Sequence, residues 1–88
     1  MRVNIRAKVK APRRETAEIT TDFIKLDSLL KFQNLVETGG EAKDIIFAGL
    51  VRVDGEVCTA RGKKIYPGMK VEARGAEITV VKAAEDES

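Results

Sequence analysis

The stretch TGGEAKDIIFAGLVRVDGEV, residues 38 to 57, contains the signals that decide the fold. Thr38 and Glu41 have the spacing of a capping box, in which the threonine oxygen accepts from the backbone N–H of residue 41 and the glutamate accepts from the N–H of residue 38. Apolar residues then recur at helical spacing, at Ala42, Ile45 and Ile46. This pattern predicts a helix from about residue 39 to residue 48.

A hairpin signal follows directly. Gly49 suits the left-handed residue at which helices often stop. Apolar and polar side chains then alternate from Val51 to Val57 around Asp54-Gly55, a pair typical of a two-residue turn between antiparallel strands. We therefore predict two short paired strands after the helix.

On the N-terminal side, two further elements are predicted. The segment from Glu18 to Phe23 is rich in β-branched residues and is typical of a strand. Leu26, Leu29 and Leu30 then have helical spacing, which predicts a short amphipathic helix that ends near Asn34.

On the C-terminal side, residues 58–64 are polar and basic, and we predict a loop there. Tyr66-Pro67-Gly68-Met69 has proline and glycine at the positions that a type II turn requires. A strand is predicted from Val71 to a break at Gly75, and a last strand follows that break.

The two ends of the chain differ in charge. Residues 2–10 alternate apolar and polar side chains, and all but one of the polar ones are basic, which is typical of a strand with a basic face. A flexible basic arm is the alternative. Residues 85–87 are all acidic. We therefore expect a basic N-terminal strand or arm at residues 1–14, a domain at residues 15–82, and an acidic flexible tail at residues 83–88.

The composition limits the function. Leu, Ile, Val and Phe make up 24 of the 88 residues, which suits one small domain with a core of its own. The chain has no histidine and one cysteine, so it lacks the commonest general base, and neither an internal disulfide nor a cysteine-based metal site can form. No apolar run approaches the ~18 residues of a membrane span. We expect a cytoplasmic protein that is not an enzyme, with no cofactor, no metal, no membrane and no small-molecule substrate.

The formal net charge is +2, but the charge is unevenly distributed. Without the three acids near the C-terminus, residues 1–84 carry 16 basic and 11 acidic side chains, a net charge of +5. Such a body favours phosphate-bearing partners, although a mildly basic surface is also an ordinary means of staying soluble. Several basic residues stand at the ends of the predicted elements, where folding could gather them on one surface: Lys25, Lys43, Arg52, Arg61, Lys63 and Lys64.

Glycines and aromatic residues bear on what such a surface could hold. Gly39-Gly40 opens the predicted helix, where it either shapes the loop or, lacking Cβ atoms, lets a phosphate backbone come close. We expect the three phenylalanines in the core. A nucleic acid would then be recognised through its phosphates and shape rather than by base stacking, which points to structured RNA as readily as DNA.

Two long segments carry a family resemblance. IKLDSLLKFQNLVETGGEAKDIIFAGLVRVDGEV, residues 24–57, is followed by ARGKKIYPGMKVE, residues 60–72. Together they resemble the S-four type RNA-binding domain, the module first known from a small-subunit ribosomal protein. The small stand-alone bacterial members look most similar, because they share the Thr-Gly-Gly turn and the Arg-Gly-Lys-Lys loop. Lys25 departs from the pattern, since many relatives have arginine there.

The resemblance implies an α+β fold, the αL motif, in which two short helices pack on a small, mostly antiparallel sheet. It also implies binding of structured RNA, either ribosomal or transfer RNA, in a ribosome-associated or translation-associated role. The positions that match the RNA-contact sites of the family are Lys25, Thr38, Gly39, Gly40, Lys43, Arg52, Arg61, Lys63 and Lys64.

Two alternative functions stay open at this point. The chain could be a protein-interaction module that uses an exposed strand edge at residues 2–10. It could also be a non-catalytic subunit of an RNA-modifying complex, in which case a partner chain would supply the chemistry. The sequence names neither the RNA nor the oligomeric state.

Overall fold

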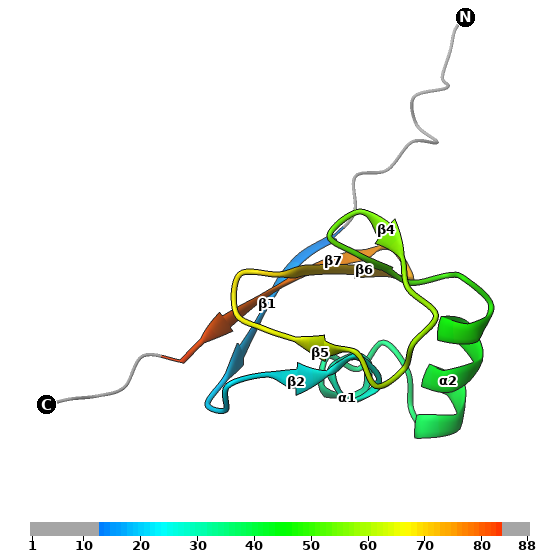
Figure 1. Ribbon diagram of the computed structural model, residues 1–88, viewed down its shortest axis with the longest axis horizontal. Coiled ribbons are helices and arrows are strands. Elements are labelled where there is room, and N and C mark those ends of the chain that lie inside the picture. Colours follow the sequence, from blue (N-terminus) through cyan, green and yellow to red (C-terminus); the bar gives the residue numbers. More distant parts are fainter. Residues whose placement is uncertain (1–12, 84–88) are drawn as a thin grey trace, which may run out of the picture.

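The computed structural model describes residues 13–83, which form two helices and seven strands (Figure 1). This α+β arrangement confirms the predicted fold class. The strand or arm expected at residues 2–10 and the acidic residues 85–87 lie outside the described residues. Neither of the helices between residues 13 and 83 has the length and apolar character needed to cross a membrane.

The main sheet has five strands in the order β1-β7-β6-β3-β4. The parallel pairing of β1 with β7 is the exception in it, because its other neighbouring strands pair antiparallel. The sheet is therefore mostly antiparallel, as predicted. Its strands are β1 (Arg13–Ile19), β7 (Ala76–Lys82), β6 (Lys70–Ala73), β3 (Arg52–Val53) and β4 (Glu56–Val57).

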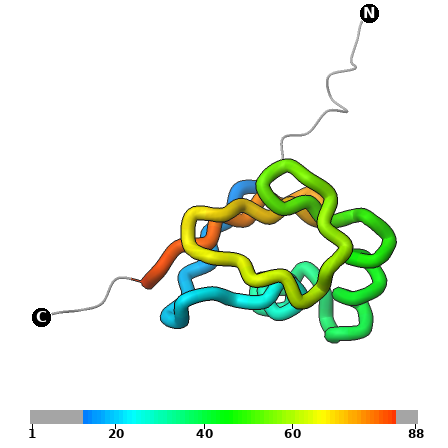
Figure 2. Tube along the Cα trace, in the orientation of Figure 1, coloured from blue at the N-terminus to red at the C-terminus, as the bar shows by residue number. Residues whose placement is uncertain are grey.

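A second, two-stranded sheet joins distant parts of the chain. Strand β2 (Ile24–Lys25) pairs antiparallel with β5 (Lys64–Ile65). In Figure 2 the loop that follows β4 crosses the molecule and returns beside the cyan segment at β2. The sequence prediction placed residues 58–64 in a loop and missed β5, because a two-residue strand has too few positions to show alternation.

The two helices supply the apolar layer against the sheet. Helix α1 (Leu26–Phe32) buries its three leucines, and α2 (Gly39–Phe47) buries the three residues predicted for its apolar face. The buried core is completed from the strands, where inward residues alternate with exposed ones. Its largest fully buried side chains are Leu26, Leu29, Leu30, Ile46, Ile65, Ile78, Val51, Val71 and Val80.

The expectation that the phenylalanines lie in the core is wrong. Phe32 is 55% exposed and Phe47 is 58% exposed, while Phe23 is half-buried. Phe32 and Phe47 are the last residues of their helices. The core beside α1 is instead filled by Leu35 and Val36, which follow that helix and are buried.

The predicted turns are confirmed by the backbone angles. Asp54 and Gly55 have φ values of 52° and 90°, as a two-residue hairpin turn with two left-handed positions requires. Gly68 has a φ of 99°, and the N–H of Met69 donates to the Tyr66 carbonyl at 3.1 Å, which closes the predicted type II turn.

The first strand differs from its prediction. It was expected from Glu18 to Phe23, but β1 starts at Arg13 and ends at Ile19. The parallel register with β7 sets these limits, since it pairs Arg13 with Ala76 and Ile19 with Lys82. A distant partner strand, rather than local β-propensity, therefore determines where this strand lies.

Candidate nucleic-acid interface

The loop before β5 is fixed to the start of α1 by two backbone hydrogen bonds. The N–H of Leu26 donates to the Lys63 carbonyl at 2.9 Å, and the N–H of Asp27 donates to the Arg61 carbonyl at 3.1 Å. The basic sequence Arg-Gly-Lys-Lys is thereby held against the first turn of the helix. These hydrogen bonds place three predicted site residues, Arg61, Lys63 and Lys64, close to a fourth. The fourth is Lys25, the N-cap of α1.

Lys25 and Lys64 are directly opposite each other in the β2–β5 ladder, and both are exposed. Like charges placed across a ladder destabilise it. Neither lysine, nor Lys63, makes an ion pair with a carboxylate of residues 13–83. Arg61 differs from them, because its Nε is 4.0 Å from Oδ2 of Asp27. We call Lys25, Arg61, Lys63 and Lys64 the basic corner.

Two aromatic rings border the basic corner, and the sequence analysis did not assign them to the site. The ring centroids of Phe23 and Tyr66 are 5.7 Å apart with an interplanar angle of 51°. Nζ of Lys64 lies 4.9 Å from the centroid of Phe23. The alternation of exposed Lys64, buried Ile65 and exposed Tyr66 was the available signal, because it places the lysine and the tyrosine on one face.

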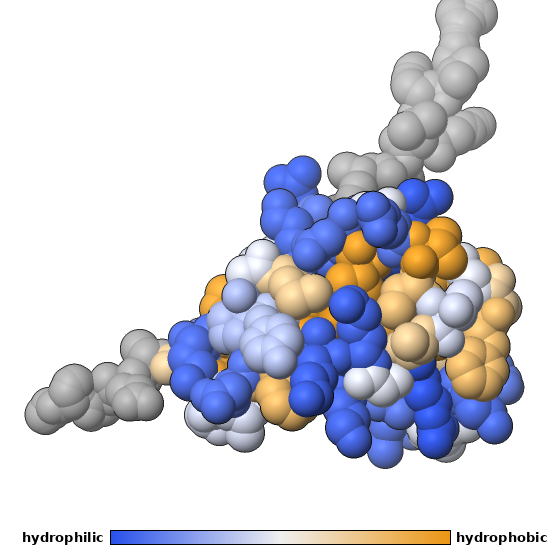
Figure 3. Space-filling model, viewed as in Figure 1, coloured by the Kyte–Doolittle hydropathy of each residue, from blue (hydrophilic) through white to orange (hydrophobic). Residues whose placement is uncertain are grey.

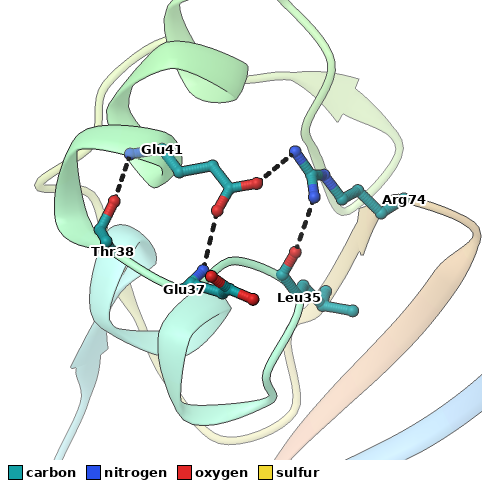
Figure 4. A network of polar contacts seen from close by, with 5 residues as sticks. All are labelled: Leu35, Glu37, Thr38, Glu41 and Arg74. Atoms are coloured by element: carbon teal, nitrogen blue, oxygen red, sulfur yellow. Dashed lines mark hydrogen bonds and ion pairs between the residues drawn. The ribbon is translucent and has the colours of Figure 1, made fainter.

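At the start of α2, half of the predicted capping box is present. Oγ1 of Thr38 accepts from the N–H of Glu41 at 3.0 Å, as predicted. The predicted return bond to the N–H of residue 38 is wrong, because Oε1 of Glu41 accepts from the N–H of Glu37 at 2.9 Å (Figure 4). The other carboxylate oxygen, Oε2, is 2.8 Å from Nη2 of Arg74, so this side chain bridges residue 37 and the turn between β6 and β7.

Arg74 completes this network, which we call the α2 anchor. Its Nη1 donates to the Leu35 carbonyl at 3.1 Å, so one guanidinium joins the loop before α2 to the helix itself (Figure 4). The hydrogen bond from the N–H of Glu37 lowers the pKa of the Glu41 carboxyl below its usual value of 4.5, and the Arg74 guanidinium lowers it further. The sequence analysis did not single out Arg74.

Gly39 and Gly40 occupy the first turn of α2. Neither has a positive φ. A Cβ atom added to Gly39 would have no neighbour within 4 Å, and one added to Gly40 would meet only Oγ1 of Thr38 at 3.9 Å. Intrachain packing and backbone strain therefore give no reason for glycine at either position, and the start of the helix is open to an approaching group.

Lys43 and Arg52 belong to other elements than the residues of the basic corner. Lys43 is exposed on α2, and Arg52 is exposed on the side of β3 opposite the buried Val51 and Val53. Nη1 of Arg52 donates to the Gly55 carbonyl at 3.2 Å. Neither side chain forms an ion pair with another residue of 13–83.

The surface character agrees with a site for a charged partner. Figure 3 shows a mostly hydrophilic face, with apolar surface emerging near β4 and along the edge at α2. In the part of the chain that the structure describes, no group of His, Cys, Asp and Glu side chains is arranged to hold a metal ion. The chemistry that the basic corner offers is that of ammonium and guanidinium donors beside two aromatic rings.

Comparison with known proteins agrees with the resemblance found in the sequence. Residues 17–81 match the S4 domain family, and this range covers most of the chain, including both helices and the two-stranded sheet. The chain belongs to the S4 domain family. The S4 domain thus includes the basic corner and the α2 anchor, while residues 1–16 precede the match.

Two curated relatives of this S4 domain have informative names. YbcJ of Escherichia coli (strain K12), named as a proposed RNA-binding protein, is 40% identical over 58 residues, which cover 66% of this chain and 83% of YbcJ. RlbA of Bacillus subtilis (strain 168), named as a proposed ribosome maturation protein, is 37% identical over 57 residues, which cover 65% of this chain and 80% of RlbA.

Proposed function

We propose that this S4 domain binds structured RNA, either ribosomal or transfer RNA, as a bacterial ribosome-associated or translation-associated protein. Family membership supports this proposal, as do the names of YbcJ and RlbA, which concern RNA binding and ribosome maturation. The proposal assigns binding alone, with no reaction.

The observation that carries the proposal is the cross-strand pair of Lys25 and Lys64. The two lysines are opposite each other in the ladder and neither forms an ion pair with a carboxylate of residues 13–83, while backbone hydrogen bonds hold the segment of Arg61 and Lys63 against the start of α1. A polyanion relieves this repulsion and releases its own counterions when it binds. Arg61 adds planar, bidentate donors suited to a phosphate, whereas each lysine contributes a point charge.

The start of α2 is a second proposed contact. Thr38 holds the first turn in place, and the open space at Gly39 and Gly40 admits a phosphate backbone close to the N–H groups of that turn. Lys43 lies one turn further along the exposed side of the helix. Arg52, on the outer side of β3, is the contact with the least support, because Glu72 is opposite it in the ladder.

The salt dependence of binding tests this function. A labelled RNA hairpin is titrated with the protein at several salt concentrations, and affinity is measured by fluorescence anisotropy. If about four to six phosphates are contacted, the slope of log affinity against log salt is on the order of −3 to −5. Lys64→Gln reduces the magnitude of the slope by about 1, since one phosphate contact is lost.

Lys70→Gln is the matched control for this measurement. Lys70 is an exposed strand lysine like Lys64, but it lies on β6 opposite Thr79 and outside the basic corner. Its substitution leaves the slope unchanged. A slope near zero for the unmodified protein would contradict the proposed mechanism.

A protein-interaction role remains a second candidate, and a specific feature favours it. Strand β1 is the end strand of the five-stranded sheet, so one of its edges has no partner strand among residues 13–83. Exposed edges of this kind accept an added strand from another protein. Co-purifying proteins that remain bound after ribonuclease treatment, and are lost when Thr16→Pro blocks the edge, would support this role or that of a subunit in an RNA-modifying complex.

A further inference from the structure

The exposed side of the two-stranded sheet combines two aromatic rings with two lysines. Ile24 is paired with Ile65, which is fully buried, so these two residues face the core. Their neighbours along each strand point the other way. That outer side therefore displays four side chains from two distant segments: Phe23, Lys25, Lys64 and Tyr66.

The distances show that these side chains form one surface. The rings of Phe23 and Tyr66 are 5.7 Å apart, the ammonium of Lys64 lies 4.9 Å from the centroid of Phe23, and Lys25 is opposite Lys64 in the ladder. Tyr66 is the outer ring of the pair, because it is 45% exposed whereas Phe23 is half-buried.

The backbone holds Tyr66 in a defined position. Its carbonyl accepts from the N–H of Met69 at 3.1 Å, and its own N–H donates to Sδ of Met69 at 3.2 Å. The type II turn thus fixes the residue that carries the exposed ring. Only side-chain rotation remains to be restricted when a flat ligand packs on it, which keeps the entropic cost of binding low.

An exposed ring beside two unneutralised ammonium groups matches the chemistry of a nucleotide. A base stacks on an aromatic face, and its phosphates attract the lysines. A base inside a duplex is covered on both faces by its neighbours, so stacking on a protein ring requires a base from a loop, bulge or end.

We propose that Tyr66, supported by Phe23, stacks on an unpaired base of the RNA, and that Lys25 and Lys64 bind the phosphates flanking that base. This inference rests on the proposed RNA-binding function and narrows its ligand to RNA helices that carry an unpaired nucleotide. It changes the expectation that a nucleic acid is recognised through its phosphates and shape alone, which assumed that the phenylalanines lie in the core.

Intrinsic fluorescence gives a direct test, because Tyr66 is the only tyrosine and the chain has no tryptophan. Two RNA hairpins are compared that differ by a single bulged nucleotide. The bulged hairpin quenches the tyrosine emission and binds about tenfold more tightly than the fully paired one, in line with the stacking of one base on a ring. The fully paired hairpin binds with little quenching.

Variants separate stacking from charge, with affinity measured by anisotropy of labelled RNA. Tyr66→Leu weakens binding of the bulged hairpin about tenfold and leaves the salt slope unchanged, since no charge is removed. Tyr66→Phe retains the preference for the bulge. Phe47→Leu is the matched control, because Phe47 is 58% exposed but belongs to the end of α2, and it leaves both affinities unchanged.

The outcomes distinguish this inference from the function on which it rests. If both hairpins bind with a steep salt slope but equal affinity, and neither quenches the emission, the stacking site is wrong and the RNA-binding function stands. If neither hairpin binds, the RNA-binding function itself fails. The quenching measurement uses the unmodified protein, so it decides the question even if Tyr66→Leu folds poorly.

Discussion

The basic corner and the α2 anchor use the same kinds of side chain in opposite ways. In the anchor, the Glu41 carboxylate is shared between the N–H of Glu37 and the Arg74 guanidinium, so each charge has a partner within the chain. In the corner, Lys25 is opposite Lys64, and neither lysine forms an ion pair with a carboxylate of residues 13–83. The two regions therefore differ in whether the fold supplies a counter-charge within residues 13–83.

The net charge of the described residues bears on this comparison. Residues 13–83 contain 12 basic and 11 acidic side chains, a net charge of +1. Any attraction of these residues for a polyanion would therefore depend on the placement of their charges rather than on the sum of the charges. This difference between the basic corner and the α2 anchor can be tested by adding a counter-charge to the corner and by removing the cation of the anchor.

The largest effect is expected from giving the corner a counter-charge. Lys25→Glu creates an opposite-charge pair with Lys64 and places an acid at the start of α1, so stability rises by about 0.2–1 kcal/mol. RNA affinity falls roughly tenfold to a hundredfold, because a charged contact is lost and repulsion replaces it. Denaturant titration and anisotropy measure the two quantities. The same substitution at Lys70 should spare affinity, and a joint loss of stability and binding at residue 25 would contradict the comparison.

Removing the cation of the anchor should lower the stability of the protein and leave its RNA affinity unchanged. Arg74→Met retains the apolar stem but loses the bonds to the Leu35 carbonyl and to Glu41, which lowers stability by about 1 kcal/mol. RNA affinity at low temperature, where the variant stays folded, is unchanged. Arg13→Met is the comparison variant, since Arg13 also forms an ion pair but a highly exposed one, worth under about 0.5 kcal/mol.

A smaller effect is expected at the start of α2, beside the anchor. Gly40→Ala has room for its methyl group and gains about 0.5 kcal/mol of stability from helix propensity. RNA affinity falls severalfold if a phosphate backbone approaches there. Thermal melts and anisotropy separate the two effects. Unchanged affinity would show that the glycines only shape the loop into the helix.

The smallest effect concerns acid sensitivity of the anchor. Because the folded state lowers the pKa of Glu41, this carboxylate stabilises the fold above pH 4.5, and the contribution disappears as the pH falls through the lowered value. Glu41→Gln removes that dependence while retaining an acceptor for the N–H of Glu37. Melting temperatures between pH 6 and pH 3 should fall less steeply for the variant than for the unmodified protein. Identical slopes would show that Glu41 is not linked to folding.

Local signals predicted local structure well. The cap at Thr38, the Asp54-Gly55 hairpin and the Pro67-Gly68 turn were all readable from the sequence, because neighbouring residues determine each of them. The limits of β1 and the existence of β5 were not readable, since each depends on a partner strand far along the chain.

The candidate site was predicted in the same uneven way. The basic residues were identifiable by type and position, but the pairing of Lys25 with Lys64 required the fold. Tyr66 was overlooked because it was considered only as a residue of the predicted type II turn, whereas its exposure follows from the alternation about Ile65.

The parallel pairing of β1 with β7 has a consequence for how the protein folds. Every cross-strand partner in this pair is 63 positions away in the chain, whereas the β6–β7 hairpin joins Ala73 to Ala76. Bringing such distant segments together costs more chain entropy than closing a hairpin. We therefore expect β1 to dock late in folding, after the helices and the hairpins have formed a nucleus. In unfolding, we expect β1 to detach early.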